Sequence, residues 1–323
     1  MRSAKLIVLA LQVSLAFTVM GAGLHARPKD TAFLLHHRGL LARSILSMNI
    51  VMPMLAVWVA LVFSLHPAVK VALVALAMSP VPPFLPARMF KTGGELSYII
   101  SLLVTASIVA LVAIPITLWF LGRRFNVPAR LPAGSLATMM LTGILVPVAI
   151  GVGLRRFAPS VADRIDKPVA VVAGAVLVAA SIPLFIHVWP GIKTLLGNGT
   201  LLAMLALTIV ALGVGHFLGG PVPEEQSVLA LATASRHPAV AITIAHAAAP
   251  TQDAVAAAVL LDLLVVALVC SPYASWARHK ASLHSRSHAP PPLHEDPRRS
   301  AHGHADENAG GRLHVGRRQE RRD

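Results

Sequence analysis

Nine long apolar stretches constrain this chain more than any other feature of its sequence. Each is about as long as the roughly 20 apolar residues that a helix needs to cross the hydrocarbon core of a bilayer. The stretches are 6–24, 41–65, 68–91, 96–121, 133–154, 168–188, 200–218, 227–248 and 254–276. Their connections are short and carry turn signals, such as 197–199 (GNG) and 219–221 (GGP). The sequence therefore predicts an all-α polytopic membrane protein with about nine transmembrane helices.

The composition excludes several other classes of protein. Charged residues make up 13% of the chain, whereas a soluble globular domain has about 25%. This excludes an ordinary cytosolic enzyme. Aromatic residues are only 5%, too few for a base-stacking surface, so we expect no nucleic-acid partner despite the net charge of +14. The predicted spans contain no nucleophile–base pair and no complete metal-ligand set, so we expect neither an enzyme nor a resident cofactor.

The C-terminal part of the chain has a different character. Residues 277–323 contain seven histidines, a proline run at 290–292 and many arginines. With few apolar residues this segment cannot bury enough surface to fold. We therefore expect two regions, a transmembrane transporter domain at 1–276 and a disordered, basic, His-rich tail at 277–323. The tail is expected to be solvated and attracted to anionic lipids; a metal contact by His302 and His304 is the alternative.

The distribution of Lys and Arg predicts an orientation, because these residues are enriched in cytoplasmic loops. With the N-terminus outside, ten of them lie in inner loops and seven in outer loops, and the tail adds ten more inside. The cluster of three arginines at 123–130 is the main feature that opposes this orientation. The chain is expected in the cytoplasmic membrane with a cytoplasmic C-terminus. For the first span, a signal peptide with a weak cleavage site at 23–26 (GLHA) is the alternative.

Two of the predicted spans contain breaks. In the third, 77–86 (AMSPVPPFLP) holds four prolines, which remove backbone donors and interrupt a helix. In the eighth, 232–239 (ATASRHPA) places an arginine and a histidine just before a proline, and the residue before a proline is pushed out of the helical region. Broken helices at corresponding places in two halves indicate a transporter's binding site. Two purely structural proline kinks are the alternative.

Charges inside the spans add to this interpretation. A charge at the bilayer centre costs about 2.5–3.5 kcal/mol on insertion scales, so it usually faces a cavity or a partner. Arg236 and Asp262 are the two clear cases, and they could form a structural ion pair or bind an anion or a proton. The residues predicted to line a substrate or ion pathway are Asn49, Ser79, Pro80, Pro82, Pro83, Glu95, Thr233, Ser235, Arg236, His237, Pro238 and Asp262.

Over residues 6–276 the chain resembles the bile acid:sodium symporter family, whose members carry organic anions together with sodium. The similar motifs are 19–24 (VMGAGL), 52–53 (MP), Pro80, 94–95 (GE), Pro115, Gln226 and 239–241 (AVA). The resemblance implies an inverted repeat of five-helix units, here lacking the first helix. It also implies a core bundle that moves against a panel of helices. The third and eighth spans would be the two discontinuous crossing helices.

The positions that match the family's sodium ligands have been replaced. They are Met48, Leu85, Pro86, Ile99, Leu103, Ala232, Arg236 and His237. Sodium requires several oxygen ligands at close range, and a guanidinium beside it would repel it. The replacements therefore argue against sodium coupling of the family's type.

Three functions follow from these observations. The first is a sodium-independent secondary transporter of a small organic anion. Arg236 would either hold the anion by its fork or stand in the place of the sodium charge. Asp262, Glu95 or His237 could then carry a proton.

The second function is a sodium symporter that uses backbone carbonyls at the two breaks together with Thr233, Ser235 and Asn49. The third is a membrane sensor or scaffold that has kept the fold and lost transport, with the tail as its working part.

Overall fold

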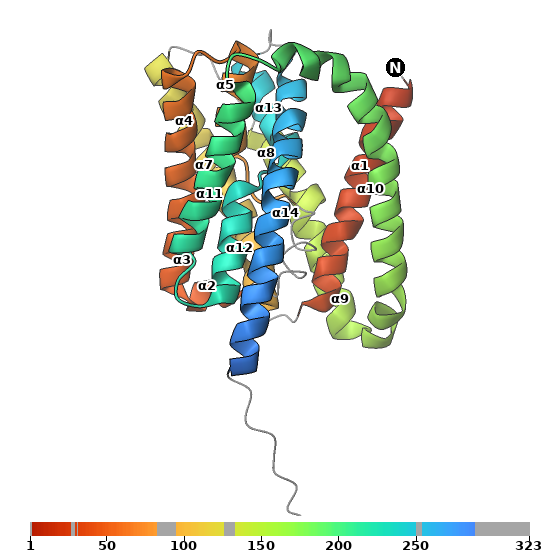
Figure 1. Ribbon diagram of the computed structural model, residues 1–323. Coiled ribbons are helices and arrows are strands. Elements are labelled where there is room, and N and C mark those ends of the chain that lie inside the picture. Colours follow the sequence, from red (N-terminus) through yellow and green to blue (C-terminus); the bar gives the residue numbers. More distant parts are fainter. Residues whose placement is uncertain are drawn as a thin grey trace, which may run out of the picture. The chain divides into compact units, whose positions relative to one another are not determined.

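All regular secondary structure in the described part of this computed structural model is helical (Figure 1). The structure describes residues 2–26, 30, 32–82, 95–125, 133–249 and 254–287. The α-helices are α1 (Arg2–His25), α2 (Phe33–His36), α3 (Arg38–Ile45), α4 (Met52–Val62), α5 (Pro67–Met78), α7 (Leu96–Phe125), α8 (Ala133–Met140), α9 (Val146–Phe157), α10 (Pro159–Leu195), α11 (Thr200–Leu218), α12 (Pro223–Ala234), α13 (Pro238–Ala248) and α14 (Val255–Ser287). Two π-helical segments, η2 (Leu46–Val51) and η3 (Leu141–Leu145), precede α4 and α9.

Seven helical runs in the described residues are long and apolar enough to cross a membrane. They are Arg38–Val62, Leu96–Arg123, Ala137–Phe157, Pro159–Leu195, Thr200–Leu218, Pro223–Ala248 and Val255–Lys280. The expectation of an all-α multi-pass membrane protein is thereby confirmed. The first and third predicted spans correspond to shorter apolar helices, Leu9–His25 and Pro67–Met78. Since residues 83–94 lie outside the described part, a total of nine spans stays a prediction.

Two predicted boundaries differ from the structure. Helix α10 begins at Pro159 rather than at 168, because a proline in the first turn lacks only an N–H that would have no helical partner there. Helix α14 continues past Trp276 to Ser287, since the basic residues after the apolar run extend the helix instead of ending it. The remainder of the expected tail, 288–323, lies outside the described residues.

One group of helices consists of α1, η3, α9 and α10, which pack against one another. Figure 1 shows α1, α9 and α10 side by side. Glycines bring α1 and α9 into close contact. A Cβ on Gly151 would meet the Met20 carbonyl oxygen and lie 2.8 Å from the Cα of Gly23. Small residues at such crossings let membrane helices pack by close backbone approach.

The second group holds both breaks. It contains α4 against α5, α5 against α13, and α11 against α12, with η2 touching α5 and α12. Its helices carry many of the buried apolar side chains, and α12 is buried from Ser227 to Ala234. Residues 1–283 make up one unit of contacts and 284–323 a second. From the second unit the structure describes only 284–287, the end of α14.

Candidate functional site

The two proline-containing segments lie against each other. After α5 ends at Met78, Ser79 is extended; after α12 ends at Ala234, residues 235–237 are non-helical until Pro238 begins α13. The His237 N–H donates to the Pro80 carbonyl oxygen and to Ser79 Oγ, at 3.0 Å in each case. Segments far apart in sequence are thus joined by one bond between backbone groups and one from backbone to side chain.

The carbonyl of Met48 has lost its helical partner. Within η2, hydrogen bonds run between residues five apart, and the Met52 N–H donates to the Ser47 carbonyl. The next donor in this pattern would be residue 53, which is a proline and has no N–H. The Met48 carbonyl oxygen therefore needs a partner from elsewhere in the protein.

Two further carbonyls are freed by the breaks. Ser79 follows the last residue of α5, so no later turn of that helix reaches its carbonyl. The helical partner of the Thr233 carbonyl would be the His237 N–H, which donates instead to Pro80 and Ser79. Three carbonyl oxygens from three different segments therefore need donors in the interior of the protein.

Arg236 supplies all three donors. Its Nε donates to the Thr233 carbonyl at 3.2 Å, Nη1 to Ser79 at 3.1 Å and Nη2 to Met48 at 3.1 Å. The side chain is only 7% exposed. Its charge lies at the C-terminal ends of α5 and α12, where helix dipoles favour a cation. Arg236 is thus a built-in cation that ties the two breaks to η2.

Hydrogen bonds of buried hydroxyl groups also connect the segments around Arg236. Ser47 Oγ and Thr233 Oγ1 are 2.7 Å apart and share a buried hydrogen bond between η2 and α12. Ser79 Oγ donates to the Leu76 carbonyl at 2.8 Å while accepting from His237. The Thr233 hydroxyl, a predicted sodium ligand in one hypothesis, is therefore already engaged.

Asp262 faces the same place from α14. Its side chain is 8% exposed, and among the described residues it forms no ion pair with Arg236. The two side chains instead line the same two small cavities. The larger has about 20 Å³ of space for the centre of a water molecule, enough for one water. The direct ion pair that was one of the sequence-based alternatives is therefore not formed, and the two side chains share small cavities instead.

Ser235 lies beside this gap. It lines the smaller cavity together with Arg236, Pro238 and Asp262. Its hydroxyl is buried and has no hydrogen-bond partner among the described residues. A buried hydroxyl without a partner costs about 1–3 kcal/mol, which a water in the cavity would remove.

Other predicted pathway residues lie apart from Arg236. Asn49 is on η2 but lines a separate cavity with Leu102 and Thr105 of α7. Glu95 is exposed and precedes α7, where its carbonyl accepts from the Ile99 N–H.

The remaining prolines have different positions. Pro82 is buried in the segment after α5, and Pro83 lies outside the described residues. The sequence interpretation missed Ser47 and the Met48 carbonyl as members of the site. The available signal was Pro53, five residues after Met48.

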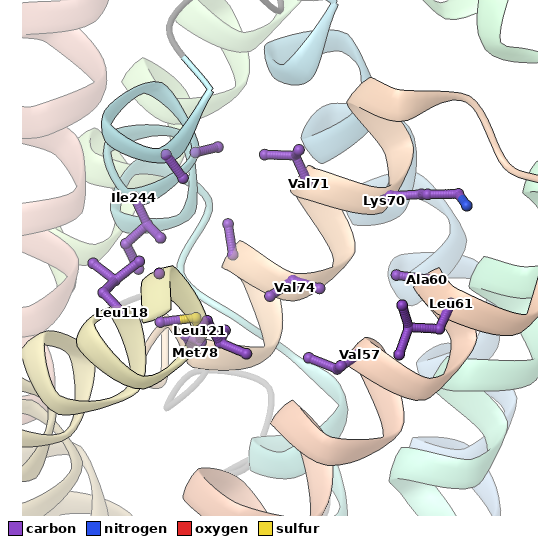
Figure 2. Close-up of a pocket in the computed structure, with 14 residues that line it drawn as sticks. Val57, Ala60, Leu61, Lys70, Val71, Val74, Met78, Leu118, Leu121 and Ile244 are labelled. Carbon is purple, nitrogen blue, oxygen red and sulfur yellow. The ribbon is translucent and has the colours of Figure 1, made fainter. Parts of the chain in front are cut away.

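Two larger apolar cavities each have one cationic side chain in their lining. One, of about 350 Å³, is formed by α4, α5, α7 and α13 (Figure 2). Lys70 of α5 lies on the side of Ala60 and Leu61 in this view. The other, of about 460 Å³, lies between α7 and the η3–α9 segment and includes Arg156. Their sizes are in the range of small-molecule sites. The sequence interpretation had treated both cations only as loop charges.

Comparison with known proteins relates the chain to one family of transporters. The family model described as "Sodium Bile acid symporter family" matches residues 12–215, and so ends before Arg236. One similar curated protein is "Sodium/bile acid cotransporter 4" of Mus musculus, 30% identical over 119 residues. That alignment covers 36% of this chain and only 27% of the relative.

Proposed function

The chain belongs to the sodium bile acid symporter family, and on this premise we propose that it is a secondary transporter of a small organic anion in which Arg236 replaces the coupling sodium ion. Members of this family are transporters and not enzymes. The seven long apolar helices agree with a multi-pass membrane protein of this kind.

The hydrogen bonds of Arg236 carry this proposal. Freed carbonyls and the C-terminal ends of half-helices are the groups that coordinate sodium in transporters with broken helices. In this chain the carbonyls of Met48, Ser79 and Thr233 accept from a guanidinium. A sodium ion about 4 Å from that guanidinium would be repelled by about 4 kcal/mol at an effective dielectric constant of about 20. It would also find its oxygen ligands already engaged.

The same contacts favour one of the two roles considered for Arg236. Three of its five N–H groups donate to backbone carbonyls, so most of its donors are engaged within the protein rather than with a substrate. These contacts fit a fixed positive charge where the two breaks meet, which we call the crossing, better than they fit a substrate-binding residue. The anion would instead bind in one of the apolar cavities, where Lys70 or Arg156 supplies a cation beside a large apolar lining. An amphipathic organic anion has matching chemistry.

The arrangement in the membrane belongs to the same proposal. We take the group α1, η3, α9 and α10 as a panel and the group around Arg236 as the moving core. The nine spans form an inverted repeat, and the third and eighth spans cross as discontinuous helices. The N-terminus faces outward and the C-terminus the cytoplasm, in the cytoplasmic membrane. The basic tail contacts anionic lipid headgroups.

Uptake into proteoliposomes tests this function. A panel of radiolabelled organic anions, from bile acids to small keto acids, is offered with sodium, potassium or choline outside. We expect at least one anion to accumulate at equal rates in the three salts. The role of Arg236 is tested in the same assay with Arg236→Gln. Arg278→Gln, which removes a positive charge at an exposed site, is the matched control.

Two outcomes would contradict the proposal in different ways. Uptake that requires a sodium gradient would mean that the carbonyls of Met48, Ser79 and Thr233 bind sodium, and that Arg236 does not replace it. A chain that takes up no anion of the panel, but loses a binding partner when the tail is removed, would support a sensor or scaffold.

A further inference from the structure

Asp262 is a buried acid for which the proposed function has so far no role. It lies on α14 in a run of apolar residues, and its side chain is 8% exposed. An isolated buried carboxylate is costly, so a membrane protein that retains one usually uses it or pairs it. Among the described residues, Arg236 shares two cavities with Asp262 but forms no ion pair with it.

The described residues that line the two cavities beside Asp262 include one other titratable group. The cavities are lined from α4 and α5 by Met52, Leu73, Leu76 and Ala77, from α11 by Leu207, Thr208 and Ala211, from α12 by Ala234, from the second break by Ser235, Arg236 and Pro238, and from α14 by Val259, Leu263 and Val266. Within this lining only Arg236 and Asp262 are titratable. A guanidinium keeps its proton in proteins, so a proton that enters or leaves here does so at Asp262.

The cavities hold groups that could relay such a proton to Asp262. The larger has room for one water, and the buried Ser235 hydroxyl in the smaller one has no hydrogen-bond partner among the described residues. The Thr208 hydroxyl on the opposite side donates to the Met204 carbonyl at 2.8 Å and can accept from a water. A water bound beside the Ser235 hydroxyl and Asp262 would complete a short polar chain within the apolar lining.

Protonation of Asp262 changes the charge at the crossing. With the carboxylate ionised, Arg236 and Asp262 sum to zero. When hydronium transfers its proton, the carboxylate becomes a neutral carboxylic acid, water is released, and the crossing carries one positive charge. A sodium ion binding among neutral ligands would change the charge by the same amount.

We propose that Asp262 is the proton-binding site of this carrier, loaded through the water-sized cavity beside Arg236. The proposal rests on the proposed function, in which a fixed guanidinium replaces sodium. The change of charge at this place is then the protonation of Asp262 on α14 and not the binding of a sodium ion.

Infrared difference spectroscopy tests this site without a substrate. Purified protein is titrated between acidic and alkaline buffers, and the C=O stretching band of protonated carboxylic acids is followed. The wild type is expected to show a band of a buried acid that forms and disappears reversibly. Asp262→Asn removes this band, while Asp163→Asn keeps it, since the Asp163 side chain is 71% exposed and pairs with Arg155.

A second variant keeps the test decisive if Asp262→Asn does not fold. Asp262→Glu retains a carboxyl group and is expected to keep the band at a shifted frequency. A band that persists in Asp262→Asn, or a wild type without any titrating buried acid, would overturn the site. Titrations in sodium and in potassium separate the two proposals, because a sodium-specific change would overturn the role of Arg236 and leave the assignment of the band to Asp262 intact.

Discussion

Replacing Arg236 with glutamine is expected to lower the free energy of unfolding by about 3–5 kcal/mol, the loss typical of breaking a buried charge arrangement. The guanidinium donates to the carbonyls of Met48, Ser79 and Thr233. Glutamine cannot reach all three, and it leaves Asp262 without a nearby cation. Reversible unfolding in mixed micelles measures the effect, and Arg278→Gln on the exposed face of α14 is the control.

A double variant separates the contribution of charge from that of packing. Arg236→Gln with Asp262→Asn removes both buried charges, so the combined loss is expected to be smaller than the sum of the single losses by about 1–3 kcal/mol. Strictly additive losses would mean that the interaction energy between the two side chains is zero. It would also remove the electrostatic link on which a shared role depends.

Gly151→Ala is expected to cost about 2–3 kcal/mol, because overpacking a well-packed contact forces the backbone to shift. A Cβ there would meet the Met20 carbonyl oxygen and lie 2.8 Å from Gly23 Cα. Gly153 lies two residues later on α9, and a Cβ there would meet nothing within 4 Å. Thermal unfolding of both variants in the same detergent gives the comparison. Equal melting temperatures for Gly151→Ala and Gly153→Ala would contradict the close packing of α1 on α9.

The position of the second break could be predicted from sequence, because a charge and a proline leave strong local signals. Arg236 and Pro238 stand out in an apolar run, and the structure ends α12 at Ala234 and begins α13 at Pro238. The partners of Arg236 could not be predicted in the same way. They are backbone carbonyls, and every residue type has one.

Met48 illustrates why the site was incomplete at the sequence level. By side chain it is an apolar residue, at a position that the sequence resemblance matched to a sodium ligand. Its contribution in the structure is a carbonyl freed by Pro53 in a π-helical segment. Hydropathy and residue type do not show a change from α- to π-helical hydrogen bonding. Once the segment is known to be π-helical, the proline five residues downstream indicates that the Met48 carbonyl has no helical partner.

The relation of Asp262 to Arg236 depended on distances that sequence does not contain. Two opposite charges in neighbouring spans suggested an ion pair, but Arg236 and Asp262 form none and line shared cavities instead. The cavities with Lys70 and Arg156 escaped notice for a related reason. Counting charges by loop predicts which side of the membrane they occupy and not the direction of their side chains.

Thermal unfolding of the purified protein in sodium, potassium and choline salts at matched ionic strength tests the central claim most directly. A ligand that binds only the folded state stabilises it by about 2.7 kcal/mol at a hundredfold excess over Kd, so an occupied sodium site would be visible as a higher melting temperature. Because Arg236 already holds the three carbonyls, we expect the same melting temperature in all three salts. A rise in sodium alone would contradict the replacement of sodium by Arg236.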